Sequence, residues 1–182
     1  MSIVIRGAAL PDGTRHDLFI DGGTYVSEIA GTPHHVIDAA GLLALPGLVD
    51  LHTHLREPGF EHSETILSGS QAAAVGGFTT VFAMANTMPV ADTAGVVEQV
   101  HSLGEAHGYV TVRPIGAVTV GLAGERLAEI GAMAQSRAAV RVFSDDGHCI
   151  HDSLLMRRAL EYVHTFDGVV AQHAQDPRLT ID

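Results

Sequence analysis

The pattern of apolar positions divides the chain into two parts with different textures. Up to residue 45, short apolar stretches at 3–5, 17–20 and 25–29 are separated by turns rich in Gly, Pro and Asp. Short runs bounded by such turn residues are typical of β-strands joined by tight connections. We therefore predict that residues 1–45 form the strands of a small β module, a segment of an N-terminal β-sandwich.

From Pro46 onward the apolar positions form continuous runs about thirty residues apart, at 48–51, 79–84, 110–115, 139–143 and 168–171. A stretch of helical character follows each run. The clearest begins after Asp152, a residue type that favours the N-cap, and places Leu155, Ala159 and Val163 one turn apart, with Met156 and Leu160 beside them. Strand followed by helix, repeated, predicts parallel βα units.

Continuous apolar strands fit a sheet that is covered on both faces. We predict an α/β fold in which residues 46–182 form the first five βα units of a (β/α)8 TIM-type barrel, although five units also fit an open doubly wound sheet. Since a complete barrel needs eight units, we expect the chain to be the N-terminal piece of a longer enzyme, or one of two chains of a cleaved one.

Charge and composition exclude several classes of partner. The chain of 182 residues carries a formal net charge of -11, and all ten of its basic residues are arginine. An acidic surface repels nucleic acid and anionic lipid, and no apolar stretch approaches the ~20 residues that span a bilayer. A single cysteine, Cys149, beside twelve histidines indicates a reducing compartment and nitrogen or oxygen ligands. We expect a cytoplasmic protein.

Candidate metal ligands stand at the end of the first apolar run. His52 and His54 are two residues apart, and side chains at that spacing project to the same face of a strand. Two imidazoles held at the mouth of a barrel strand are rigid donors that suit zinc. The alternative is a pair of partly exposed histidines, and the motif by itself does not decide between the two.

Polar residues recur where a barrel places its active site, at the carboxyl ends of later strands. They are Asn86 after the second run, Asp145 and Asp146 after the fourth, and His173 after the fifth. Each has a simpler interpretation, because Asn and Asp-Gly are common in turns and a histidine can be buried in a core. Their joint occurrence at strand ends favours one converging site.

These residues carry a resemblance to a known family. The strings GLVDLHTHLREPG at 47–59, ANTMP at 85–89, FSDDG at 143–147 and AQH at 171–173 closely resemble type I dihydroorotases of the amidohydrolase superfamily. The resemblance runs over the whole chain. It implies that His52 and His54 bind the more buried zinc, that Asp146, rather than Asp145, bridges to a second metal, and that His173 ligates that second metal.

The resemblance also implies roles outside the metal set. Arg56 and Asn86 resemble the residues that hold the carboxylate of the substrate, a task that suits a planar guanidinium and an amide. A further metal-binding histidine and the aspartate that acts as general acid and base are expected beyond Asp182. We therefore expect no general acid or base within this segment, and we expect the segment alone to be inactive.

The absence of lysine supports a bridging carboxylate. Many relatives, such as hydantoinases and allantoinases, join their metals through a carbamylated lysine, and this chain has none to modify. The same absence removes a phosphate-binding Gly-Lys-Ser/Thr loop and a Schiff-base lysine, and no Gly-x-Gly-x-x-Gly string occurs. Kinase, aldolase and dehydrogenase functions are therefore excluded.

The function implied is zinc-dependent, reversible hydrolysis of the cyclic amide of dihydroorotate to N-carbamoyl-aspartate, a step of pyrimidine synthesis, with one or two zinc ions activating water. Two alternatives stay open: a related cyclic amidase (hydantoinase or allantoinase), and a non-catalytic scaffold that assembles aspartate carbamoyltransferase. Expected partners are the small substrate and the rest of the barrel, and a homo-oligomer or a complex with aspartate carbamoyltransferase is compatible with these readings. Whether His148, Cys149 and His151 reach the site is left open.

Overall fold

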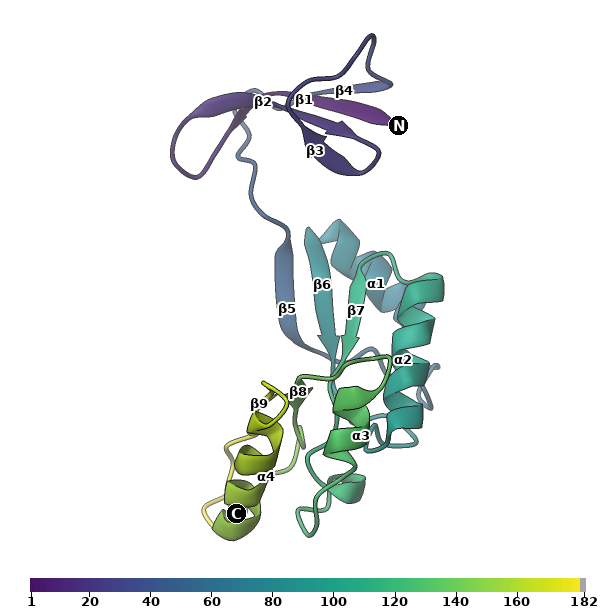
Figure 1. Cartoon of the computed structure of the whole chain (residues 1–182), viewed down its shortest axis with the longest axis vertical. Coiled ribbons are helices and arrows are strands. Elements are labelled where there is room, and N and C mark those ends of the chain that lie inside the picture. The colour runs from purple at the N-terminus through teal and green to yellow at the C-terminus, as the bar shows by residue number, and fades with distance from the viewer. Residues whose placement is uncertain (181–182) are drawn as a thin grey trace. The chain divides into compact units, whose positions relative to one another are not determined.

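The structure is a computed structural model that describes residues 1–180 (Figure 1). The chain divides into two compact units, Met1–Pro46 and a second unit that begins at Gly47. The change in hydrophobic pattern at Pro46 falls beside this division. Because each unit has its own internal contacts, we describe each by itself.

The N-terminal unit is one four-stranded sheet in the order β3-β2-β1-β4. Its strands are β1 (Ser2–Ala9), β2 (Arg15–Asp21), β3 (Thr24–Val26) and β4 (His35–Asp38). β1 pairs antiparallel with β2 and parallel with β4. The third strand is shorter than expected and β4 was not predicted. Within residues 1–180 this unit has a single sheet, so the second layer of the predicted sandwich is not among the described residues.

The second unit contains five strands, each inside one of the predicted apolar runs or overlapping it. They are β5 (Leu48–Thr53), β6 (Phe78–Ala83), β7 (Thr111–Pro114), β8 (Val142–Phe143) and β9 (Val169–Val170). All neighbouring pairs are parallel, and a bridge between Gly116 and Phe143 links β7 to β8. The fourth strand begins later than predicted, at Val142, and Ala139 has φ +47, a left-handed conformation that a strand residue does not adopt. The five strands therefore follow one another in chain order.

Helices separate the strands, as the periodicity predicts. They are α1 (Ile66–Val75), α2 (Ala94–His107), the 3-10 turn η1 (Val120–Leu122), α3 (Ile130–Gln135) and α4 (Ser153–His164). Helices α1 and α2 lie beside each other against the β5–β7 sheet (Figure 1). Among the described residues no helix follows β9, so the helix of the fifth predicted unit is not confirmed. No helix in this range has both the length and the hydropathy to cross a bilayer.

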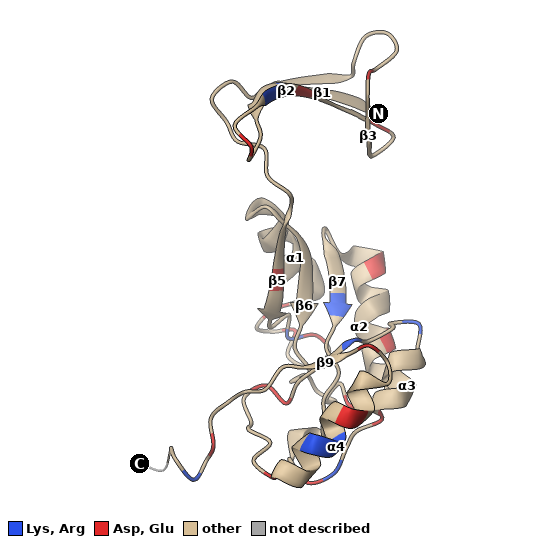
Figure 2. Ribbon diagram, turned by 60° about the vertical axis from the view of Figure 1, so that its left-hand side comes forward, with Lys and Arg blue, Asp and Glu red and all other residues tan. Residues whose placement is uncertain are grey.

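Helix α4 shows how local sequence defines an element. The Asp152 side chain accepts hydrogen bonds from the backbone N–H groups of Leu154 and Leu155, both at 2.8 Å, which caps the helix. On its inner face Ala159 and Val163 are buried, whereas Leu160, expected beside them, is half exposed. On the exposed side of α4, Arg157 and Glu161 lie one turn apart and form an ion pair at 2.8 Å, and Figure 2 shows a basic and an acidic segment on this helix. The helix is therefore amphipathic, with a narrower apolar face than predicted.

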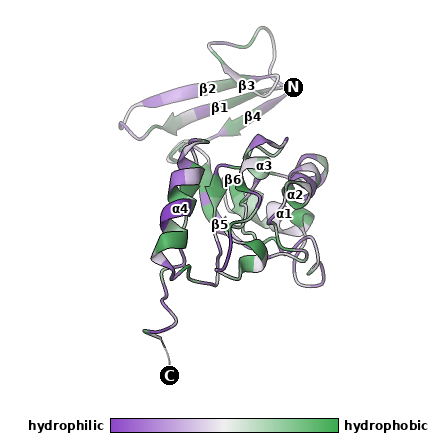
Figure 3. Cartoon of the chain, turned by 60° about the horizontal axis from the view of Figure 1, so that its bottom comes forward, coloured by the Kyte–Doolittle hydropathy of each residue, from purple (hydrophilic) through white to green (hydrophobic). Residues whose placement is uncertain are grey.

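The core of the second unit is built from the strands and the inner faces of the helices (Figure 3). One cluster joins β6 and β7 to α1 and α2 through residues that include Ile66, Val81 and Val112, and Leu55, which follows β5, belongs to it. A larger cluster contains Val97, Ile130, Met133, Phe143 and Ala159, all fully buried. Because these buried side chains pack the strands against the helices, they hold the ends of the strands in fixed positions.

Helix α2 packs on β7 at a distance that only glycine permits. A Cβ added at Gly104 would lie 2.7 Å from Cβ of Val112, well inside van der Waals contact. Gly95, in the first turn of the same helix, is exposed and has open space around it. The two glycines lie in the same helix, but only Gly104 packs closely against a neighbouring strand.

We predict opposite effects of alanine at the two glycines of α2. G95A should raise the free energy of unfolding by up to about 1 kcal/mol, because alanine favours helix. G104A should lower it by about 1–2 kcal/mol, because overpacking against Val112 outweighs the helix propensity. Urea unfolding of both variants tests this, and a G104A protein as stable as G95A would contradict the close packing.

A buried carboxylate fixes the loop that follows β7. Asp145 Oδ1 accepts hydrogen bonds from the backbone N–H of Val118 at 2.8 Å and of Thr119 at 3.0 Å, and Oδ2 accepts one from the Thr119 hydroxyl. That hydroxyl in turn accepts a hydrogen bond from the backbone N–H of Gly124 at 2.9 Å. Burial raises the pKa of Asp145, although these hydrogen bonds act in the opposite direction. Asp145 is thus a structural residue, because both of its carboxylate oxygens already accept hydrogen bonds from the loop.

We predict that D145A lowers the free energy of unfolding by about 3 kcal/mol or more, because it leaves several buried donors without an acceptor. D145N keeps a carbonyl oxygen for the two backbone N–H groups, so we expect it to lose only about 1 kcal/mol. Thermal or urea unfolding compares the variants. Equal stability of D145A and D145N would show that the hydrogen bonds do not hold the loop.

Candidate metal centre

The end of β5 is fixed to β6 in a way that leaves two histidines side by side. The Thr53 hydroxyl donates to the carbonyl of Phe82 at 2.8 Å, and the Thr53 carbonyl accepts from the N–H of Met84 at 2.9 Å. His52 and His54 flank this residue, and their ring centroids are 5.1 Å apart. The strand alternation that the sequence predicted therefore brings the two rings together.

The opposing carboxylate comes from a tight turn after β8. The N–H of His148 donates to the carbonyl of Asp145 at 2.8 Å, and Gly147 has φ +85, as the third position of a type II turn requires. Asp146 is the second residue of this turn and is buried. The turn interpretation and the ligand interpretation of this segment are thus compatible, since the turn is what presents Asp146.

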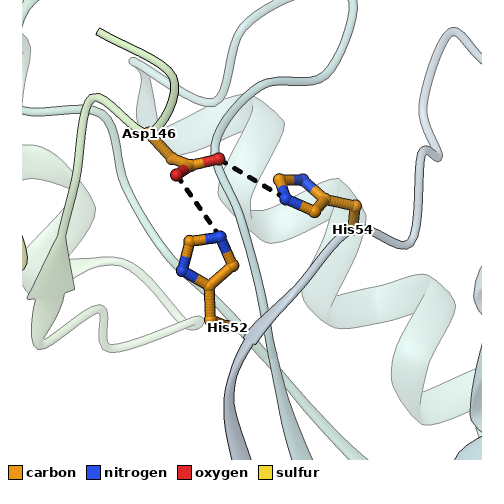
Figure 4. A group of neighbouring side chains, drawn as sticks. All are labelled: His52, His54 and Asp146. Carbon is orange, nitrogen blue, oxygen red and sulfur yellow. Dashed lines mark ion pairs between the residues drawn. The ribbon is translucent and has the colours of Figure 1, made fainter. Parts of the chain in front are cut away.

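The two histidines and Asp146 converge (Figure 4). His52 Nε2 lies 3.3 Å from Asp146 Oδ1, and His54 Nε2 lies 3.5 Å from Asp146 Oδ2. One donor atom from each residue lies within 4.8 Å of the other two, and within residues 1–180 no other group of three His, Cys, Asp or Glu side chains does so. Two imidazole nitrogens and a carboxylate oxygen at this separation form a donor set that suits zinc.

His173 approaches the same carboxylate from the end of β9. Its Nδ1 lies 3.7 Å from Asp146 Oδ1, while its Nε2 lies 3.0 Å from Gln175 Oε1. It contacts Asp146 but does not belong to the group of three convergent donors. Asp146 therefore lies between the histidine pair of β5 and the single histidine of β9.

Asn86 contacts this cluster directly, through both atoms of its amide group. Asn86 Oδ1 lies 3.1 Å from His54 Nδ1, and Asn86 Nδ2 donates to Asp146 Oδ2 at 3.1 Å. Sequence reasoning placed Asn86 near the site but did not find these two contacts, because side-chain pairing across 32 and 60 residues leaves no local pattern.

Arg56, the second residue expected to bind substrate, is not joined to the cluster of His52, His54 and Asp146. Arg56 follows β5, is half-buried and has φ +62, a left-handed conformation unusual for a residue with a side chain. Within residues 1–180 its guanidinium makes no hydrogen bond or ion pair. The structure thus places Arg56 two residues from His54 but does not join its side chain to the cluster.

A cavity of about 310 Å³ is lined in part by His173. It also shows where His148, Cys149 and His151 lie, which the sequence did not predict. Its lining includes His148, Cys149 and His151, together with Asp145 and His173. The Cys149 sulfur accepts a hydrogen bond from Gln172 Nε2 at 3.3 Å. These residues line a space next to the site and lie outside the convergent donor group.

Comparison with known proteins places the chain in a family. A family profile described as Dihydro-orotase-like matches residues 41–182. The chain is 71% identical to a dihydroorotase of Leifsonia xyli, 64% identical to one of Streptomyces coelicolor and 53% identical to one of Mycobacterium tuberculosis. These alignments cover 98%, 97% and 100% of the chain and 42%, 42% and 43% of the relatives. The chain thus spans less than half the length of these relatives.

Solved structures with the same fold belong to cyclic amidases. An L-hydantoinase (dihydropyrimidinase) from Arthrobacter aurescens superimposes with a TM-score of 0.74 at 18% identity, over 92% of this chain and 39% of that one. A D-hydantoinase superimposes with a TM-score of 0.72 at 18% identity, over 97% and 40%. At this identity the likeness shows the fold alone. The profile match and the identities to the curated relatives together show that the chain belongs to the dihydroorotase-like family of the amidohydrolases.

Proposed function

We propose that this chain is the N-terminal part of a zinc-dependent dihydroorotase, which interconverts dihydroorotate and N-carbamoyl-aspartate. The observation that carries the proposal is the meeting of His52 and His54 with the Asp146 carboxylate, in a chain whose relatives at 53–71% identity are named dihydroorotase. A metal bound there would supply activated water near neutral pH and would polarise the amide carbonyl.

The residues divide the ligation as follows. His52 and His54 supply imidazole nitrogens at the end of β5, and His173 supplies one after β9. Asp146 Oδ1 faces His52 and His173, and its Oδ2 faces His54. A carboxylate approached by three imidazoles through both of its oxygens can bridge two ions, which supports Asp146 as the bridging ligand in a chain that has no lysine. Asp145 does not compete for this role, because its oxygens are bound to the loop after β7.

Arg56 supports dihydroorotate over the neutral substrates of other cyclic amidases. A guanidinium two residues along the chain from a proposed metal ligand suits a substrate that carries a carboxylate, and the hydantoin ring itself carries none. The formal charge of the chain is -11, so attraction of an anion depends on local positive charge at the site. We propose that Arg56 and the metals provide it.

The rest of the enzyme would complete the barrel. Five strands are present and eight close a TIM-type barrel, so three more strands, a further metal ligand and the general acid and base would come from sequence after residue 182. The relatives are more than twice as long as this chain, which supports that proposal. We expect the 182-residue segment by itself to be inactive.

Metal analysis of the full-length protein, purified without chelator, tests the site. We expect one or two zinc ions per chain, and we expect H52A and D146A to lose most of the metal, because each removes one of three convergent donors. H107A, which removes an exposed histidine at the end of α2, is the matched control and should keep its zinc. A wild-type protein with neither zinc nor activity would instead indicate a non-catalytic scaffold.

Substrate selection tests the proposed role of Arg56. We expect hydrolysis of dihydroorotate in preference to hydantoin and allantoin, and we expect R56Q to lower kcat/KM for dihydroorotate roughly 10- to 100-fold, as loss of a hydrogen bond to a charged group predicts. Zinc content should not change. R137Q, which removes an exposed arginine paired with Glu105, serves as control. Turnover of hydantoin or allantoin but not of dihydroorotate would refute the assignment.

A further inference from the structure

Asn86 lies between two of the proposed metal ligands and touches both. Its Oδ1 is 3.1 Å from His54 Nδ1, on the side of the ring away from the Asp146 contact, and its Nδ2 is 3.1 Å from Asp146 Oδ2. His54 Nε2 faces the same oxygen, Oδ2, at 3.5 Å. The three side chains therefore close a small ring of polar contacts at the carboxyl ends of β5, β6 and β8.

The carboxylate decides which way the amide of Asn86 points. A carboxylate oxygen only accepts hydrogen bonds, so the amide N–H₂ group must face Asp146, and the amide oxygen must then face His54. The reverse orientation would put the amide oxygen against the carboxylate oxygen and leave both without a donor. The orientation of Asn86 is therefore a consequence of the charge on Asp146.

The amide in turn decides the tautomer of His54. An amide oxygen only accepts, so Nδ1 of His54 must carry the proton and donate it. In a neutral imidazole the other nitrogen, Nε2, then holds the free lone pair. That nitrogen is the atom that faces Asp146 and the centre of the proposed metal site.

We propose that Asn86 is a positioning residue for the metal centre: its oxygen holds His54 in the tautomer that offers Nε2 to the metal, and its N–H₂ group aims Asp146 at the same point. This inference rests on the proposed function and adds to it a structural role for a residue that the sequence assigned to the substrate. One N–H of the amide is used by Asp146, and the second N–H stays available to a substrate carboxylate.

The two roles of Asn86 predict different measurements. Partners that orient metal-bound histidines commonly affect metal affinity 10- to 100-fold. A residue that only binds substrate affects KM and leaves the affinity for metal in the absence of substrate unchanged. Metal affinity without substrate therefore separates positioning from substrate binding.

The experiment uses the full-length protein, with the zinc dissociation constant measured by competition with a chromophoric chelator. We expect N86L, which keeps the branching and the number of side-chain heavy atoms of Asn86 and removes both hydrogen bonds, to weaken zinc binding 10- to 100-fold and to alter the visible spectrum of the Co²⁺-substituted protein. T87V, which removes the hydroxyl of the next residue from its bond to Pro89, is the matched control and should retain wild-type affinity. An affinity within threefold of wild type for N86L would overturn the inference.

A second measurement uses wild-type protein and therefore does not depend on whether a variant folds. In metal-free wild-type protein with ¹⁵N-labelled histidine, Nδ1 of His54 should carry a proton, which it donates to Asn86 Oδ1. A His54 ring without a proton on Nδ1 would also overturn the inference. If wild-type protein binds zinc and shows these properties but does not hydrolyse dihydroorotate, the proposed function fails while the role of Asn86 stands.

Discussion

The site depends on one constraint, the parallel pairing that brings the carboxyl ends of β5, β6, β7, β8 and β9 to one edge. Thr53 ties the end of β5 to β6, and Ser144 donates from its backbone to Gly116 and from its hydroxyl to Ala171, which ties the end of β8 to its neighbours. Because these ties are next to His52, His54, Asp145 and Asp146 in sequence, small errors in strand register would move the donors apart. Packing of the helices against the strands maintains that register.

The sequence predicted the second unit better than the first. Continuous apolar runs identify the strands, although Leu48, Val49 and Leu51 of β5 are exposed rather than buried. The family resemblance singled out His52, His54 and Asp146, and their donor atoms converge. The short strand β4 has only Val36 and Ile37 as apolar residues, between His35 and Asp38, and it forms because β1 offers it a parallel partner. Such tertiary pairing leaves little trace in the local sequence.

The contacts around the donors were beyond sequence reasoning for a related reason. The two bonds of Asn86 and the anchoring of Asp145 on Thr119 join residues far apart in the chain, and amide or carboxylate side chains fit turns equally well. The role of Arg56 stays a prediction, since within residues 1–180 its side chain makes no hydrogen bond or ion pair with the cluster. The residue types at the strand ends thus indicate a site, whereas the role of each residue within the site becomes clear only from the structure.

The two adjacent aspartates have different roles, and this difference affects how related sequences should be compared. Asp145 has its oxygens taken up by the loop after β7, while Asp146 faces three imidazoles, and the difference arises from one step along the backbone. A deletion before this pair, compensated by an insertion after it, would preserve both letters of the motif. It would move the second aspartate into the place that anchors the loop and leave glycine in the place that faces the imidazoles. Homologues with an intact Asp-Asp-Gly string can therefore differ in whether the string serves a metal, and alignment gaps on either side of it are more informative than the string itself.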